Sequence, residues 1–107
     1  MLTIEERHGV VVIRVRGDID VTTAPGLVEA IGKTADHAPD RRVVVHLGAC
    51  DYFDSSGISA LLRCKKRLGG RLGVVAPSGS SVHRVLEMVG LVEALLVADT
   101  LDSAVGL

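Results

Sequence analysis

The run RRVVVHLGA, residues 41–49, is the feature that most restricts the fold of this chain, because it is almost continuously apolar. A strand with one face in water alternates apolar and polar side chains, whereas a strand covered on both faces is apolar throughout. Strands of the second kind belong to sheets that carry helices on their faces. The run therefore predicts an internal strand of an α/β sheet.

The segments before this run predict a β-hairpin. Residues 2–6, LTIEE, alternate apolar and polar side chains, and RHG supplies a turn glycine. Residues 10–17, VVVIRVRG, continue with a second strand. Two strands joined by so short a turn must run antiparallel.

Three helices are expected from apolar side chains that recur at helical spacing. They cover residues 27–35, 58–68 and 82–89, and glycines follow the second and third. Thr22 or Thr23 is the expected N-cap of the first helix, with Pro25 in its first turn and HAPD after its end. Residues 71–76 and 93–99 predict strands, and 100–107 a short helix capped by Thr100 or Asp99.

The predicted order is β-β-α-β-α-β-α-β-α. Each later strand–helix–strand unit should be a right-handed parallel crossover, while the first hairpin is antiparallel. We therefore expect a single α/β domain over residues 1–107, with a mixed sheet and about four helices. Hydrophobic residues at 48% and charged residues at 23% fit a globular chain.

Charge and hydropathy exclude several classes of protein. A formal net charge of −1 gives no electrostatic footprint for nucleic acid or for an anionic membrane surface. No apolar run approaches the roughly 20 residues that span a bilayer. The first ten residues carry acids where a signal peptide is basic and apolar, so we expect a cytoplasmic protein with Cys50 and Cys64 as free thiols.

The junction YFDSSG, residues 52–57, places an acid and two hydroxyls between a strand and a helix. Asp and Ser are favoured N-caps, since their oxygens accept the unpaired N–H groups of the first turn. One capping oxygen suffices, however. Gly57 lies in that first turn, where Gly costs about 1 kcal/mol of helix propensity relative to Ala. We interpret its missing side chain as leaving the hydroxyls open to a large partner.

A phosphate on a serine of this junction would meet free N–H groups and the positive end of the helix dipole. The phosphate carries about −1.5 to −2 charges at neutral pH. The helix would not melt, but the surface beside it would change sign. The junction therefore favours a modification that controls recognition.

Three stretches carry a resemblance to a known family. They are GDIDVTTAPGL at 17–27, VVVHLGACDYFDSSGISALL at 43–62 and GGRLGVVAPSGSSVHRVLEMVGL at 69–91. In this order they resemble the STAS domain, and more narrowly the free-standing bacterial anti-sigma factor antagonists. The most specific part is D-S-S-G-I about 35 residues after a G-x-x-D loop. The strand before it departs from the family's L-D-L-S-G-V, with His46, Gly48 and Cys50 in place of Asp, Ser and Val.

The resemblance implies a partner switch in transcription regulation, such as a stress response. The unphosphorylated antagonist binds an anti-sigma factor that is also a serine kinase, which frees a sigma factor. ATP-dependent phosphorylation releases the antagonist, and a phosphatase resets it. By position the phosphoacceptor is Ser55, and the partner-binding residues are Asp20, Asp54, Ser55, Ser56 and Gly57. Asp20 on its own would be interpreted as a turn or cap residue.

Other chemistry finds little support in the sequence. The four histidines share no metal-ligand spacing with each other or with the cysteines. A serine nucleophile needs a base within hydrogen-bond reach, and no G-x-S-x-G elbow is present. We therefore expect no enzyme, cofactor or metal. His46 would sense pH if it is buried, and Cys50 and Cys64 favour packing over a redox role.

Two alternative functions remain from other classes. One is a STAS accessory subunit that regulates a lipid-transport ABC system, in which an acceptor serine has no purpose. The other is a scaffold subunit of a larger STAS signalling assembly, which usually brings a sensor domain before the first strand.

Overall fold

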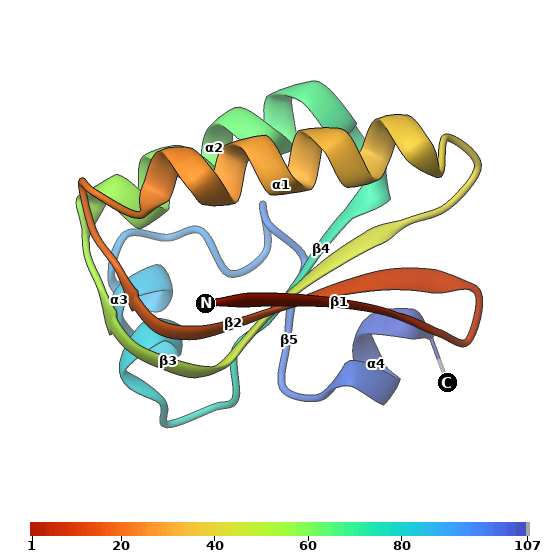
Figure 1. Cartoon of the computed structure of the whole chain (residues 1–107). Coiled ribbons are helices and arrows are strands. Elements are labelled where there is room, and N and C mark those ends of the chain that lie inside the picture. The colour runs from red at the N-terminus through yellow and green to blue at the C-terminus, as the bar shows by residue number, and fades with distance from the viewer. Residues whose placement is uncertain (107) are drawn as a thin grey trace.

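A five-stranded sheet in the order β1-β2-β3-β4-β5 forms the centre of the computed structural model (Figure 1). The structure describes residues 1–106. The strands are β1 Leu2–Arg7, β2 Val10–Ile19, β3 Val43–Phe53, β4 Leu72–Val75 and β5 Val97–Ala98. The helices are α1 Ala24–His37, α2 Ser55–Leu68, α3 Ser81–Met88 and α4 Leu101–Val105, with a 3-10 turn at Gly69–Arg71.

The sheet is mixed, as the sequence predicts. β1 and β2 pair antiparallel through a turn in which His8 and Gly9 have φ values of 52° and 81°. The pairs β2–β3, β3–β4 and β4–β5 are parallel. The predicted hairpin, the predicted order of elements and the four helices are confirmed.

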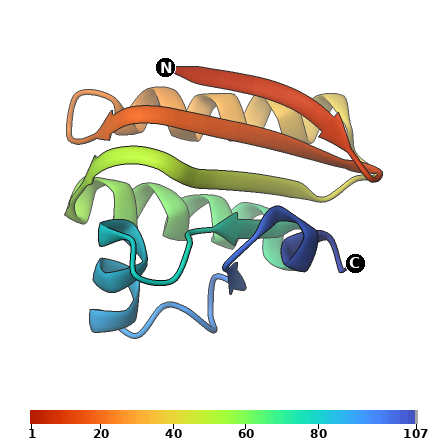
Figure 2. The same cartoon turned by 90° about the horizontal axis from the view of Figure 1, so that it is seen from below.

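Helices cover the middle of the sheet on both faces, which explains the apolar run in β3. α1 and α2 lie side by side on one face, over a core that contains Val43 and Val45 (Figures 1 and 2). Val44 points to the other face, where α4 contributes Leu101 and Ala104 to a second, smaller core. All three valines of β3 are therefore fully buried.

The structure corrects three predicted boundaries. β3 continues to Phe53 instead of ending near residue 49, because two irregularities in its register let it pair with β2 along its whole length. α2 begins at Ser55, three residues before its apolar pattern starts. The stretch 93–99 is mostly turn, and only Val97 and Ala98 pair with β4. Leu95 in this stretch is fully buried. Residues 93–99 are therefore apolar because the turn is buried, and not because they form a strand.

No helix among residues 1–106 has the length and apolar character that a membrane span requires.

Candidate functional site

The site begins where two neighbouring parallel strands end. Ile19 of β2 and Phe53 of β3 are register partners and the last residues of their strands. The acids that follow them in sequence, Asp20 and Asp54, therefore leave the sheet at the same edge. This carboxyl edge of a parallel sheet is the usual place for functional groups in α/β folds.

Asp54 is the N-cap of α2. Its backbone is extended, and its carboxylate Oδ1 accepts the N–H of Ser56 at 2.8 Å. Its carbonyl oxygen accepts the N–H groups of Gly57 and Ile58 at 3.0 and 3.2 Å. The side chain is half-buried. The capping function that the sequence predicted for this junction is thus confirmed, and Asp54 alone supplies it.

Ser55 is the first residue of α2 and its side chain is exposed. Its hydroxyl takes part in none of the side-chain hydrogen bonds within residues 1–106. Because Asp54 already caps the helix, the Ser55 oxygen is not required for the local structure. It lies at the positive end of a 14-residue helix.

Gly57 has a different purpose from the one predicted. The residue is buried, and a Cβ added to it would lie 2.7 Å from Cδ1 of Phe53. Phe53 is itself part of the main core. The missing side chain therefore admits the Phe53 ring beneath the first turn of α2, and the interpretation that it opens the serine hydroxyls to a partner is wrong.

Asp20 organises the loop that leads into α1. Its Oδ1 accepts the N–H groups of Thr22 and Thr23 at 2.9 and 3.1 Å, and its own N–H donates to Oγ1 of Thr23 at 2.9 Å. Thr23 occupies the N-cap position of α1 but makes no capping bond with its side chain. Asp20 therefore has the turn role that its residue type indicates, at the same edge as Asp54.

A shallow hollow next to the junction was not foreseen from the sequence. It lies between the first halves of α1 and α2 and has a volume of about 240 Å³. Its lining residues are Val21, Ala24, Pro25, Val28, Ser56, Ser59, Ala60 and Arg63. Val21 is 76% exposed at its mouth. An apolar residue inside the polar loop DVTT was the one signal that could have indicated this surface.

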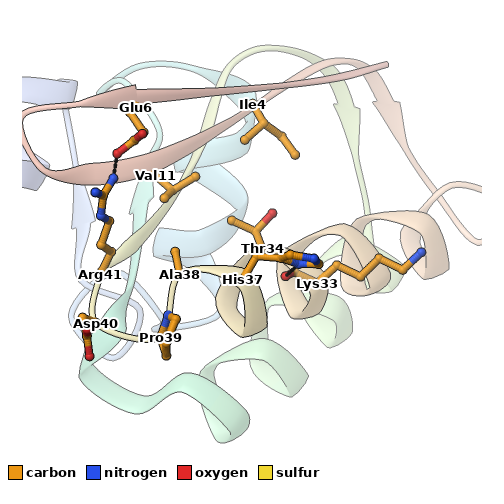
Figure 3. Close-up of a pocket in the computed structure, with 10 residues that line it drawn as sticks. All are labelled: Ile4, Glu6, Val11, Lys33, Thr34, His37, Ala38, Pro39, Asp40 and Arg41. Carbon is orange, nitrogen blue, oxygen red and sulfur yellow. Dashed lines mark hydrogen bonds and ion pairs between the residues drawn. The ribbon is translucent and has the colours of Figure 1, made fainter.

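A second, larger hollow lies at the other end of α1, away from Ser55. It has a volume of about 650 Å³ and opens between β1 and the last turns of α1 (Figure 3). Ile4 and Val11 approach it from the sheet, while Thr34 approaches it from α1 and Ala38 from the residue that follows α1. An ion pair between Glu6 and Arg41 borders it.

The candidate metal and redox residues are dispersed. No group of three His, Cys, Asp or Glu side chains within residues 1–106 could hold a metal ion. Cys50 and Cys64 are both free thiols in contact with the main core. Burial raises the pKa of each thiol, which lowers the reactivity of both.

His46 is half-buried on the face of β3 opposite α1 and α2. Its ring Nδ1 accepts the N–H of Gly48 at 3.1 Å, and a Cβ at Gly48 would lie 3.1 Å from that nitrogen. Burial and the nearby Arg14 guanidinium hold the pKa of His46 below its usual 6.5, against a smaller opposing effect of Glu5. The ring is therefore neutral in the folded protein near pH 7.

Comparison with known proteins identifies the family. The model of the STAS domain matches residues 1–104, so the chain belongs to the STAS domain family. Anti-sigma-F factor antagonist RsfB of Mycobacterium tuberculosis is 32% identical over 105 residues, covering 96% of this chain and 84% of that protein.

Solved structures agree with this assignment. The crystal structure of an anti-sigma factor antagonist from Mycobacterium paratuberculosis has a TM-score of 0.84 and 34% identity, covering 97% of this chain and 89% of that one. The phosphorylated form of the Bacillus cell fate determinant SpoIIAA shares the fold, with a TM-score of 0.65 and 22% identity over 98% of this chain and 96% of that one.

Proposed function

We propose that this STAS-domain chain is an anti-sigma factor antagonist that is switched off by phosphorylation of Ser55. The observation that carries the proposal is an exposed hydroxyl at the N-terminus of α2, next to a helix cap that does not need it. The names of the relatives RsfB and SpoIIAA support the class of function, and SpoIIAA has been solved in a phosphorylated form.

The helix end explains how such a switch would operate. A phosphate on Ser55 would gain from the helix dipole, while Asp54 keeps its bond to the Ser56 N–H. The fold would therefore stay intact. The added charge of about −1.5 to −2 would join two carboxylates at the same edge, and a partner that favours the unmodified surface would be repelled.

The partner in this proposal is an anti-sigma factor that is also a serine kinase, and a phosphatase acting on phospho-Ser55 would reset the switch. Asp20, Asp54, Ser55 and Ser56 would form the polar part of the contact. Gly57 would contribute only through the shape of the helix start, because it is buried. The ATP chemistry would belong to the kinase, so this chain would be no enzyme and would work in the cytoplasm without nucleic acid or membrane contact.

The first experiment recovers the chain from its native cells with ADP present and identifies the proteins bound to it. Recovery of an anti-sigma factor kinase supports the proposal. Recovery of transporter subunits without a kinase contradicts it and favours the lipid-transport alternative.

The second experiment tests the switch itself. Ser55→Ala should bind the kinase constitutively, whereas Ser55→Asp should bind it poorly. Ser103→Asp adds the same charge at an exposed position on α4 and should bind like the unmodified chain. Equal binding of the kinase by both Ser55 variants would contradict the mechanism. After incubation of the unmodified chain with kinase and ATP, mass spectrometry should locate the phosphate on Ser55.

A further inference from the structure

The outer edge of β1 presents backbone groups that no strand within residues 1–106 pairs with. β1 is the first strand of the sheet, and β2 is its one neighbour in this part of the chain. The Met1 amino group donates to the Arg16 carbonyl, and the Arg16 N–H donates to the Met1 carbonyl, both at 2.8 Å.

Hydrogen-bonding direction alternates along an antiparallel strand, so this pair fixes the direction at every position of β1. Thr3, Glu5 and Arg7 bond toward β2. The N–H and C=O groups of Leu2, Ile4 and Glu6 therefore point outward.

This edge lacks several of the usual protections against pairing. Natural edge strands are blocked by Pro, by charged side chains and Lys above all, by bulges or by a covering segment. β1 contains neither Pro nor Lys, and its register with β2 is continuous. Ile4, in its centre, is 57% exposed and lies at the border of the large hollow beside α1 (Figure 3).

The charges of β1 are already paired within the chain. Glu5 contacts Arg14 and Arg7, and Glu6 contacts Arg41. The strand can therefore approach another strand without bringing an unpaired charge to the contact.

The geometry points to a symmetric dimer in which β1 pairs antiparallel with β1 of a second copy, with Ile4 opposite the partner copy's Ile4. In this register Leu2 lies opposite Glu6 of the other copy, and Glu6 opposite Leu2. All three outward-facing residues then exchange backbone hydrogen bonds, and the two sheets become one continuous sheet. The contact is isologous, as in most homodimers.

Neighbouring registers are worse. Centring the contact on Glu5 would place the two Glu5 carboxylates directly opposite each other, which is destabilising in a sheet. It would also leave Leu2 without a strand partner. Centring it on Thr3 would leave Glu6 unpaired. Only the register centred on Ile4 uses every outward group and brings the two exposed isoleucines together.

The dimer does not depend on the proposed function. The first turn of α2 follows the end of β3, and β2 lies between β3 and β1. Pairing at β1 therefore leaves the Ser55 surface of both copies open. An antagonist with a different partner would dimerise equally well.

Sedimentation velocity across a range of about 1 to 500 μM tests the inference, because self-association depends on protomer concentration. The unmodified chain should shift from monomer to dimer. Ile4→Lys should weaken the dimer at least about tenfold, since an edge lysine opposes pairing. Ile4→Pro should also weaken the dimer, because it removes an outward N–H that pairs with the second copy. The monomer tolerates this change, since Pro is accepted in an edge strand. Met88→Lys, a control at a side chain that is 80% exposed on α3, should dimerise normally.

A cross-linking experiment fixes the register. In a background with Cys50→Ala and Cys64→Ala, Ile4→Cys should form a disulfide between copies on mild oxidation. Directly paired residues of this kind have Cα atoms about 5.5 Å apart, within the range that a disulfide spans. Glu6→Cys, on the same edge, should not cross-link. A chain that stays monomeric throughout, or a dimer that survives both Ile4→Lys and Ile4→Pro, overturns the inference.

Discussion

The Asp54 carboxylate accepts the backbone N–H of Ser56 at 2.8 Å, so the cap of α2 skips the residue between them. Ser55 is covalently part of the helix start but does not hold it together. This separation allows a serine to be modified at a helix terminus without local unfolding.

The first prediction concerns the stability of the two neighbours. Asp54→Ala should lose about 1 kcal/mol of unfolding free energy, the usual cost of removing an N-cap. Ser55→Ala should stay within about 0.5 kcal/mol of the unmodified chain, as expected for an exposed substitution. Urea unfolding measures both, and Asp54→Asn, which keeps a capping oxygen, is the control. Equal losses for the two alanine variants would show that the Ser55 hydroxyl is structural after all.

The second prediction concerns Gly57. Alanine raises helix propensity by about 1 kcal/mol, but its methyl group would collide with the Phe53 ring. Overpacking of this kind costs about 1–3 kcal/mol, so Gly57→Ala should destabilise the chain. Gly26→Ala is the matched control, because it also lies in the first turn of a helix and a Cβ there meets nothing within 4 Å.

The control variant Gly26→Ala should therefore be neutral or stabilising. In the double variant Phe53→Leu with Gly57→Ala, the losses should not add, because the two side chains compete for one space. Additive losses would mean that the ring moves aside, and the packing explanation of Gly57 would fail.

Some features of this fold could be predicted from the sequence and others could not. The apolar run of β3 predicted that helices cover both faces of the sheet. The pattern was sufficient because consecutive side chains of a strand point to opposite faces, so an apolar run marks both faces as buried. The contact between Gly57 and Phe53 was not predictable, since it depends on how the chain turns between strand and helix. The buried turn around Leu95 was mistaken for strand because both are apolar. At the site, the helix cap was predicted from the sequence. The hollow beside Val21 could not be predicted, because it depends on how α1 and α2 pack against each other.

The third prediction concerns pH. Burial and Arg14 hold the pKa of His46 below 6.5 in the folded chain, so the folded state takes up this proton less readily than the unfolded state. The contribution of His46 to the free energy of unfolding is therefore complete above about pH 6.5 and is lost as pH falls below that value. Between pH 8 and pH 5, the urea midpoint should drop for the unmodified chain and should drop less for His46→Gln.

The control for this effect is His37→Gln, at an exposed position in the last turn of α1, which should keep the full pH dependence. The window stays above the range of Glu5 and Glu29, whose pKa values lie below the usual 4.5. An NMR titration of His46 with an ordinary midpoint would contradict the prediction.

The last prediction concerns the hollow between α1 and α2, and it rests on the proposed function. Val21 stands 76% exposed where the Asp20 loop meets the mouth of this hollow. An exposed apolar side chain beside a polar switch has the composition of a binding hot spot with a polar rim. Val21→Glu should weaken binding to the anti-sigma factor by about tenfold or more, with unfolding free energy unchanged. Ile4→Glu makes the same change on the edge strand β1, whose residues do not line this hollow, and should bind normally in a calorimetric titration. If the two variants bind alike, the contact surface does not include this hollow.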